Sequence, residues 1–577
     1  MKPVKQGAPE VKSPAAEKAC ALLLVIVAAV LALIPTLDRS RTVIWFYTGS
    51  YYLMLALGAA WALAIVAVLR EEKTDIRAFF RGHGSGLVLA ILFAALAVIS
   101  THPQFRLLSD ETNLLSVSKS MLYDKHVANV TQGKWFHLNF YAEEYQPEKR
   151  PFLFPFCTYL LHVLFGFRVW HPFVVNALAL AATLFLIFVF LKKRVGAAAA
   201  AGGMLLVLAQ PVVTQTAASA GMDMLSALCL TAGLMSLGWF LEKPGPGRFL
   251  LVWFQFLLLS HARYEGFLYF GVLLGALGWN GKLRAGFFRP LWLYAMTPLL
   301  MVPIYWQRVL MPTDLEVPEG AHAFDPSNLI AHTADFLRAM FRFDFYLPYA
   351  SVVNLAGLVF LGVLGVRIWT RAANATAAER SWWGISAALV GTYWVVVNAH
   401  YSPFALIYDG VRLLVPAVLV LSVSCALGLG GLAWFRARPF YFVSLAAAVF
   451  CTYHPMSLEN RGWNAVLLTR EYRNVTSFLE RQGHRNFLVI AYRPGIYTAR
   501  DWGAVSFLYA NANREALMQE FRQHLYRDLF VVQEIDLATG QPSSQTALDP
   551  AFALEPLIEF QKQIPALTKT RISRVRH

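Results

Sequence analysis

Residues 171–194 read HPFVVNALALAATLFLIFVFLKKR, an apolar run long enough to cross a bilayer that ends in three basic residues. A helix of about 20 apolar residues spans the hydrocarbon core, and Lys and Arg collect on its cytoplasmic side. Similar runs recur from about residue 20 to about residue 453. The pattern predicts a polytopic α-helical membrane protein in which residue 194 faces the cytoplasm.

The composition agrees with a membrane protein. Of 577 residues, 57% are apolar and only 15% are charged, which excludes a disordered chain and a compact cytosolic enzyme. Lys and Arg number 50 against 35 Asp and Glu, for a net charge of +15. Because basic residues between spans explain this excess, nucleic acid is not expected as a partner.

The lengths of the apolar runs predict about thirteen transmembrane helices. They cover residues 20–37, 43–69, 85–100, 170–191, 197–213, 223–241, 249–261, 264–279, 290–311, 350–369, 382–398, 412–434 and 440–453. The connections that carry most Lys and Arg alternate with those that carry few. We therefore expect an integral plasma (inner) membrane protein with a cytoplasmic N-terminus.

Three regions are expected along the chain. Residues 1–83 form an N-terminal tail and an extra transmembrane hairpin, and residues 84–453 form a transmembrane core with outer loops 101–169 and 312–349. Residues 454–577 form an extracytoplasmic α/β domain, which would be periplasmic in a Gram-negative cell. In it, helices at about 468–482 and 513–526 each precede a strand, at 487–492 and 529–532.

The first outer loop begins with an expected amphipathic helix at the membrane surface. Leu114, Val117 and Met121 fall on one face, and Ser and Lys side chains fall opposite. Asp110 and Glu111 stand in the first turn, where the helix dipole favours acids whether or not they do chemistry, with Ser109 as a suitable N-cap. On these residues alone both interpretations stay open.

The sequence after this helix resembles a known family. Glu148-Lys149-Arg150-Pro151 is followed by an apolar run that Phe165-Gly166 closes. With the pair Asp110-Glu111, this order resembles the GT-C superfamily of integral-membrane glycosyltransferases, which contains protein O-mannosyltransferases and lipid A aminoarabinose transferases. The family has a Glu-Lys-Pro-Pro-like turn at this place, so Arg150 replaces its first proline.

Three later passages resemble the same family. The segment 219–223, which ends in Asp223, is similar to its second acidic outer turn, and Arg263-Tyr264-Glu265-Gly266 is similar to an Arg-x-Glu-Gly turn. The segment 409–416, which includes Arg412, is similar to the start of a late span. The resemblance covers roughly residues 85–453.

The resemblance implies a sugar donor linked to a polyprenyl phosphate, and an acceptor that is a lipid, a glycan or a protein. It implies an inverting single displacement in which Asp110 is the base and Glu111 orients Asp110 or the acceptor. It implies support from Asp223 and Glu265, and donor phosphate binding by basic residues of the outer face. These are Lys149, Arg150, Arg263 and Arg412.

Each of these charges also has a simpler interpretation. Basic residues at span ends commonly extend to lipid headgroups, and Glu265 could merely pair with Arg263. The sequence has no glycine-rich phosphate loop and no dinucleotide fingerprint, which agrees with a lipid-linked donor. No cofactor is certain. A divalent metal is one option, because some family members bind one through residues corresponding to Glu148 and a later histidine, here His322 or His332.

Two other functions compete with transfer. A transporter or channel would also be multi-pass, although transporters commonly show paired broken helices in two halves and short outer loops. A non-catalytic glycan-binding or assembly protein could have the same fold.

Overall fold

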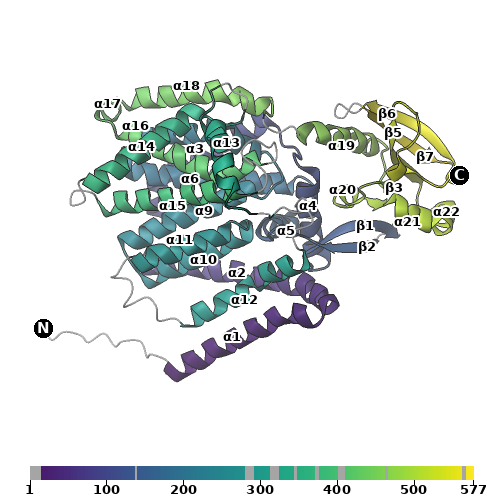
Figure 1. Cartoon of the computed structure of the whole chain (residues 1–577), viewed down its shortest axis with the longest axis horizontal. Helices are drawn as coiled ribbons and strands as arrows, with labels where there is room; N and C mark the ends of the chain where they lie inside the picture. The colour runs from purple at the N-terminus through teal and green to yellow at the C-terminus, as the bar shows by residue number, and fades with distance from the viewer. Residues whose placement is uncertain are drawn as a thin grey trace.

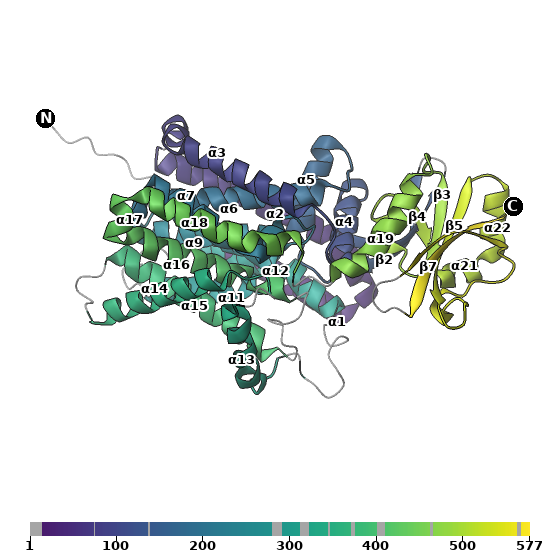
Figure 2. The same cartoon turned by 90° about the horizontal axis from the view of Figure 1, so that it is seen from above.

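The computed structural model describes residues 14–73, 75–136, 139–279, 291–311, 322, 324–343, 347–370, 376–400, 410–461, 465–561 and 567–576. A bundle of long helices makes up most of the molecule, and a mixed α/β domain lies beyond one end of it (Figure 1, Figure 2). We call the end of the bundle beside this domain the domain end.

The thirteen expected spans all fall on helices of the bundle, and the fifth falls on a bent pair. The helices are α1 (Pro14–Leu37), α2 (Arg39–Glu71), α3 (Ile76–Thr101), α6 (His171–Val195), α7 (Ala197–Leu208), α8 (Pro211–Ala217), α9 (Asp223–Glu242), α10 (Pro246–Ala262), α11 (Gly266–Trp279), α12 (Leu291–Leu310), α14 (Ser351–Thr370), α15 (Ala377–Ala399), α16 (Val415–Gly431) and α18 (Pro439–Leu458).

Eight of the described helices are long and apolar enough to cross a membrane, or nine if the pair α7 and α8 counts as one span. The protein is therefore an integral membrane protein, but the predicted count of thirteen is not confirmed. The pair is bent by 79°, and Pro211 is the first residue of α8. Proline lacks the N–H that a continuous helix needs, so it starts a new helix here.

Three of the basic connections predicted to share one face lie together, those that follow α2, α6 and α9. Lys193 and Arg194 at the end of α6 pair with Glu242 at the end of α9, at 3.2 and 3.4 Å. Arg248 in the first turn of α10 pairs with Glu72, just after α2, at 2.8 Å. Asp223, the first residue of α9, lies about 30 Å from Glu242 at the other end of this helix, because an α-helix rises about 1.5 Å per residue.

Two shorter helices, α4 (Leu108–Tyr123) and α5 (Leu153–Phe165), lie at the domain end of the bundle (Figure 1). Three further short elements complete the bundle: α13 (Asn328–Phe341), the 3-10 turn η3 (Val411–Leu414) and α17 (Ala433–Ala437).

Helix α4 is covered on both sides. Leu114, Val117 and Met121 pack into the core of the bundle, as the pattern predicts. The opposite face, on which Ser and Lys are predicted, is covered as well, because Leu115 packs into the core of the α/β domain and Lys119, 3% exposed, pairs with Asp501 at 2.7 Å. The helix thus joins the two parts of the molecule.

The α/β domain contains a seven-stranded sheet in the order β2-β1-β4-β3-β5-β7-β6. Strand β3 pairs in parallel with β4 and β5, and the other pairs are antiparallel. The strands are β1 (Ala128–Phe136), β2 (Asn139–Pro147), β3 (Phe487–Ala491), β4 (Gly503–Val505), β5 (Asp528–Asp536), β6 (Leu554–Gln561) and β7 (Thr568–Val575). Its helices are α19 (Ala465–Glu480), α20 (Gly495–Thr498), α21 (Phe507–Ala512) and α22 (Arg514–Arg522), with a 3-10 turn η4 (Ser544–Thr546).

The sheet is built from two distant parts of the chain. The elements α19, β3, α22 and β5 lie close to where the sequence predicts them. The hairpin of β1 and β2, however, comes from the first outer loop, and it joins the sheet where Gly133 pairs with Ala504. The sheet therefore extends beyond the predicted region 454–577 and includes residues 128–136 and 139–147.

Candidate functional site

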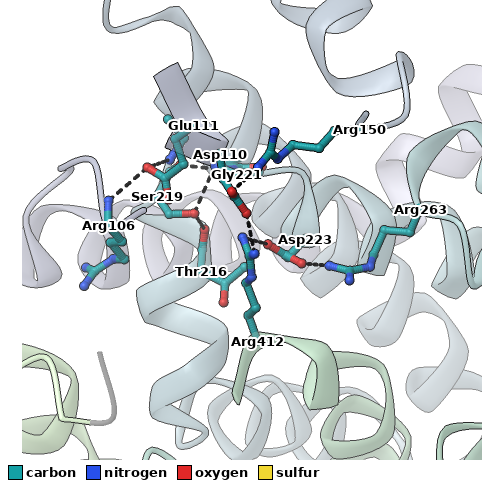
Figure 3. Close-up of polar contacts among 12 residues, drawn as sticks. Arg106, Asp110, Glu111, Arg150, Thr216, Ser219, Gly221, Asp223, Arg263 and Arg412 are labelled. Carbon is teal, nitrogen blue, oxygen red and sulfur yellow. Dashed lines mark hydrogen bonds and ion pairs between the residues drawn. The ribbon is translucent and has the colours of Figure 1, made fainter. Parts of the chain in front are cut away.

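Asp110, in the first turn of α4, binds two guanidinium groups (Figure 3). Its Oδ1 accepts a hydrogen bond from Nη2 of Arg150, and its Oδ2 accepts one from Nη2 of Arg412 at 2.6 Å. Arg150 lies in the turn between β2 and α5, and Arg412 lies in η3, which leads into α16. Three segments far apart in the sequence thus meet at one carboxylate.

Asp223, the first residue of α9, continues the arrangement. It pairs with Nη1 of Arg263, and its Oδ2 lies 3.6 Å from Nη1 of Arg412. Arg412 therefore stands between two aspartates, with one on each side (Figure 3).

A glutamate stands at each end of this series. Nη1 of Arg150 donates to Oε1 of Glu148 at 2.6 Å, and Arg263 donates from Nε and Nη2 to the two oxygens of Glu265, both at 3.1 Å. We call the resulting series of four carboxylates and three guanidinium groups the charge chain. Its members in order are Glu148, Arg150, Asp110, Arg412, Asp223, Arg263 and Glu265.

Strict alternation of sign makes the burial of these charges tolerable, since an unpaired buried charge costs several kcal/mol. The members are not equally accessible. The side chain of Asp110 is 21% exposed, whereas that of Asp223 is 2% exposed. Of these two aspartates, Asp110 is the one that a substrate can reach.

The two arginines decide the protonation state of Asp110. Burial alone would raise its pKa, but the charges of Arg412 and Arg150 outweigh burial and hold the pKa well below its usual range. Asp110 is therefore ionised at neutral pH. It is also a weak base for as long as both guanidinium groups hold it.

The side chain of Glu111 points away from the charge chain and accepts hydrogen bonds from backbone amides. Its Oε2 accepts hydrogen bonds from the amides of Arg106 at 3.0 Å and Ala220 at 3.2 Å, and its Oε1 has no hydrogen-bond partner among the described residues. Burial raises its pKa to about 7. Helix α4 has Leu107 as its N-cap residue with no side-chain cap, so Ser109 does not serve as the cap.

The turn that precedes Asp223 is held by a residue that the sequence analysis missed. Nδ2 of Asn176, fully buried on α6, donates to the carbonyl oxygens of Ser219 and Gly221, both at 2.8 Å. The hydroxyl of Ser219 donates to the carbonyl of Thr216 at 2.7 Å (Figure 3). A buried amide within an otherwise apolar span was a signal available in the sequence.

The structure thus brings six of the residues predicted for catalysis, donor phosphate binding or site support into direct ionic contact. They are Asp110, Arg150, Arg263, Arg412, Asp223 and Glu265. Glu111 adjoins them, and Lys149 lies half-buried in the turn between Glu148 and Arg150. Asp409, part of the late motif, lies outside the described residues, as does much of the first half of loop 312–349.

The metal prediction finds no support in the described part of the chain, where no three His, Cys, Asp or Glu side chains gather to hold an ion. The carboxylate of Glu148 pairs with Arg150. His322 is exposed and His332 belongs to α13.

Two crystal structures of ArnT from Cupriavidus metallidurans are similar to this chain. The apo structure matches with a TM-score of 0.51 and 12% identity over 85% of this chain and 98% of that one. The structure bound to undecaprenyl phosphate matches with the same score and identity over 84% and 97%. An oligosaccharyltransferase from Archaeoglobus fulgidus has a TM-score of 0.40 and 11% identity over 77% and 67%, too weak a likeness to use in argument.

No protein-family model and no curated protein sequence matches the chain. The likeness to ArnT therefore establishes the fold. The chain has the polytopic α-helical membrane fold of ArnT, which agrees with the fold class that its sequence predicts.

Proposed function

We propose that this chain is a glycosyltransferase that moves a sugar from a polyprenyl-phosphate-linked donor to an acceptor. The observation that carries the proposal is the position of Asp110, a partly exposed carboxylate between two guanidinium groups at the domain end of the bundle. Glycosyl transfer needs a base for the acceptor and cations for the departing phosphate, and this site holds both. The fold of ArnT, one structure of which holds undecaprenyl phosphate, supports the same donor chemistry.

The transfer is a single displacement with inversion at the sugar. An acceptor hydroxyl oxygen attacks the anomeric carbon as its proton passes to Asp110, and the bond from that carbon to the phosphate oxygen breaks. The electron pair leaves with the polyprenyl phosphate. Arg150 and Arg412, with Lys149 beside them, hold the departing phosphate, because a guanidinium can bind two phosphate oxygens at once.

Donor binding also prepares the base. Arg150 and Arg412 both bond Asp110 in the structure. A bound phosphate shares these guanidinium groups, weakens their hold on Asp110 and raises its pKa. Asp110 thus becomes an effective base when the donor is present.

The other predicted residues support this arrangement. Arg263 and Glu265 keep Asp223 paired, and Asp223 in turn positions Arg412. The α/β domain lies against α4, the helix that carries Asp110. We place this domain and the site outside the cell membrane, with the basic end of the bundle in the cytoplasm.

A transporter is the main competing function. Transporters of the inverted-repeat type have broken helices at corresponding places in two halves. Among the described helices one bent pair is found, α7 and α8, and it carries no member of the charge chain. No observation in the described part of the chain specifically favours this competing function.

The proposal is tested by sugar transfer from a panel of polyprenyl-phosphate sugars to lipid, glycan and peptide acceptors. Purified wild type should release polyprenyl phosphate and form one glycosylated product. A matched control for Asp110→Asn is Asp124→Asn, because Asp124 is an exposed residue at the opposite end of α4. Transfer should fall by a factor of about 100 or more in Asp110→Asn and stay unchanged in Asp124→Asn. No transfer by wild type with any donor would refute the proposal.

A further inference from the structure

Gln307 is a buried polar residue near the last turn of α12, and it belongs to none of the motifs described above. Its side chain is 1% exposed, in a helix whose other buried residues are mainly apolar. Helices α1 and α2 pack along α12 on the outside of the bundle. A polar group at such a place is costly unless its hydrogen bonds are satisfied.

The amide of Gln307 uses both of its N–H groups. Nε2 donates to the carbonyl oxygens of Glu148 at 2.5 Å and Arg150 at 2.7 Å, and Oε1 accepts a hydrogen bond from the hydroxyl of Tyr264 at 3.2 Å. Because a carbonyl oxygen can only accept a hydrogen bond, the amide atom that faces the two carbonyl groups must be the nitrogen. The side chain therefore bonds the turn of residues 148–150 to the turn of residues 263–265.

These two turns are the two ends of the charge chain. Glu148 and Arg150 begin it, and Tyr264 stands between its last two members, Arg263 and Glu265. The neutral bonds from Gln307 join the ends, so the ionic series closes into a ring. Arg308 adds to the contact, since its guanidinium carbon lies 3.6 Å from the centre of the Tyr264 ring.

We propose that Gln307 is a positioning residue for the sugar donor, an inference that rests on the proposed function. Its two donor bonds fix the carbonyl groups on either side of Lys149. They thereby set the directions in which Lys149 and Arg150 approach the phosphate and in which Arg150 meets Asp110.

The experiment compares Gln307→Met, which keeps the volume but removes the hydrogen bonds, with Gln307→Glu, whose carboxylate oxygens would face the two carbonyls. The matched control is Gln255→Met on α10. Gln255 is also a buried amide, 4% exposed, that donates to the carbonyl of Cys229 at 3.0 Å and accepts from Nε1 of Trp61 at 2.7 Å. It has no contact with the charge chain among the described interactions.

Three quantities are measured on the purified full chain: the melting temperature, the binding of polyprenyl phosphate, and the KM values for donor and acceptor. We expect Gln307→Met to raise the donor KM and to weaken polyprenyl phosphate binding by about tenfold while leaving the acceptor KM unchanged. Gln307→Glu should raise the donor KM further and weaken polyprenyl phosphate binding more strongly. Gln255→Met should lower the melting temperature comparably and leave the donor KM unchanged.

A wild-type donor KM in Gln307→Met would overturn the inference, and so would an equal rise in Gln255→Met, which would indicate a general effect of lost stability. These results differ from failure of the proposed function. In that case wild type itself would neither bind polyprenyl phosphate nor transfer a sugar, and the positioning role would fall with it.

Discussion

Arg412 is the residue on which the two halves of the charge chain depend, because it contacts both Asp110 and Asp223. A lysine at this position keeps the charge but presents a single ammonium group, which cannot bond two carboxylates in the fixed geometry of a guanidinium. We therefore expect Arg412→Lys to lower kcat/KM by roughly ten- to a hundredfold. The measurement is steady-state transfer. Arg438→Lys, an exposed position at the start of α18, is the control and should match wild type.

Glu111 gives a prediction about pH. In the folded protein the carboxyl group of Glu111 keeps its proton up to about pH 7, whereas an ordinary glutamate, with a pKa of 4.5, loses it near pH 4.5. Between these values the folded state binds more protons than the unfolded state, so stability falls as the pH rises and is lowest above pH 7. The difference corresponds to about 3 kcal/mol.

Glu111→Gln should remove this dependence, because a neutral amide oxygen can still accept from the amides of Arg106 and Ala220. As the pH rises from about 5 to about 8, the melting temperature of wild type should fall, and that of the variant should fall less. If both proteins gave the same slope, Glu111 would not be the titrating group.

At the scale of elements, helix α4 links the bundle to the α/β domain through Lys119. Nζ of Lys119 pairs with Asp501 at 2.7 Å, donates to the carbonyl of Thr498 at 3.0 Å and lies 3.7 Å from the centre of the Phe140 ring. Removing one partner of a buried pair leaves the other charge uncompensated.

Lys119→Met should therefore lower the melting temperature and make the segment after residue 461 more sensitive to limited proteolysis. The expected loss of stability is about 3 kcal/mol. Lys569→Met serves as the control, because Lys569 pairs with Glu559 at the surface and contributes little. Equal protease resistance of Lys119→Met and wild type would contradict the role of α4 as the link.

The elements differ in how far the sequence could predict them. A run of about 20 apolar residues is a local signal, so every expected span falls on a helix. The covering of the polar face of α4 could not be predicted, because the pattern of one helix does not reveal what packs against it. The pairing of Gly133 with Ala504 joins residues about 370 positions apart, and nothing local in either segment indicates it.

At the scale of the whole molecule, the α/β domain and the basic end of the bundle face opposite sides of the membrane if the proposed transfer takes place on the outer face. Leu508 in α21 is 81% exposed, and Trp369 in the last turn of α14 is 89% exposed. We expect a membrane-impermeant thiol reagent to label Leu508→Cys in intact cells. Trp369→Cys should be labelled only after the cells have been permeabilised. The background replaces the exposed Cys20 and Cys451 with Ser, and the reverse labelling would contradict the orientation.

The site itself could be predicted in part. The motifs that carry Asp110, Arg150, Arg263 and Arg412 are local, and the alternation of basic connections predicted that they share one face. Their alternating order could not be derived, since it depends on how η3 and the start of α9 pack together. Asn176 and Gln307 each stand out in the sequence as an amide in an apolar helix, but the backbone atoms that they bond leave no motif, so the turns that they hold could not be predicted.

The most direct test of the central claim measures two properties of Asp110→Asn on one preparation: equilibrium binding of polyprenyl phosphate and the single-turnover rate of sugar transfer. Because the variant removes the anion that competes for Arg150 and Arg412, it should bind polyprenyl phosphate at least as tightly as wild type. Its transfer rate should be lower than that of wild type by a factor of about 100 or more. Transfer at the wild-type rate would contradict the role of Asp110 as the base, and parallel loss of binding and transfer would contradict the competition between Asp110 and the phosphate.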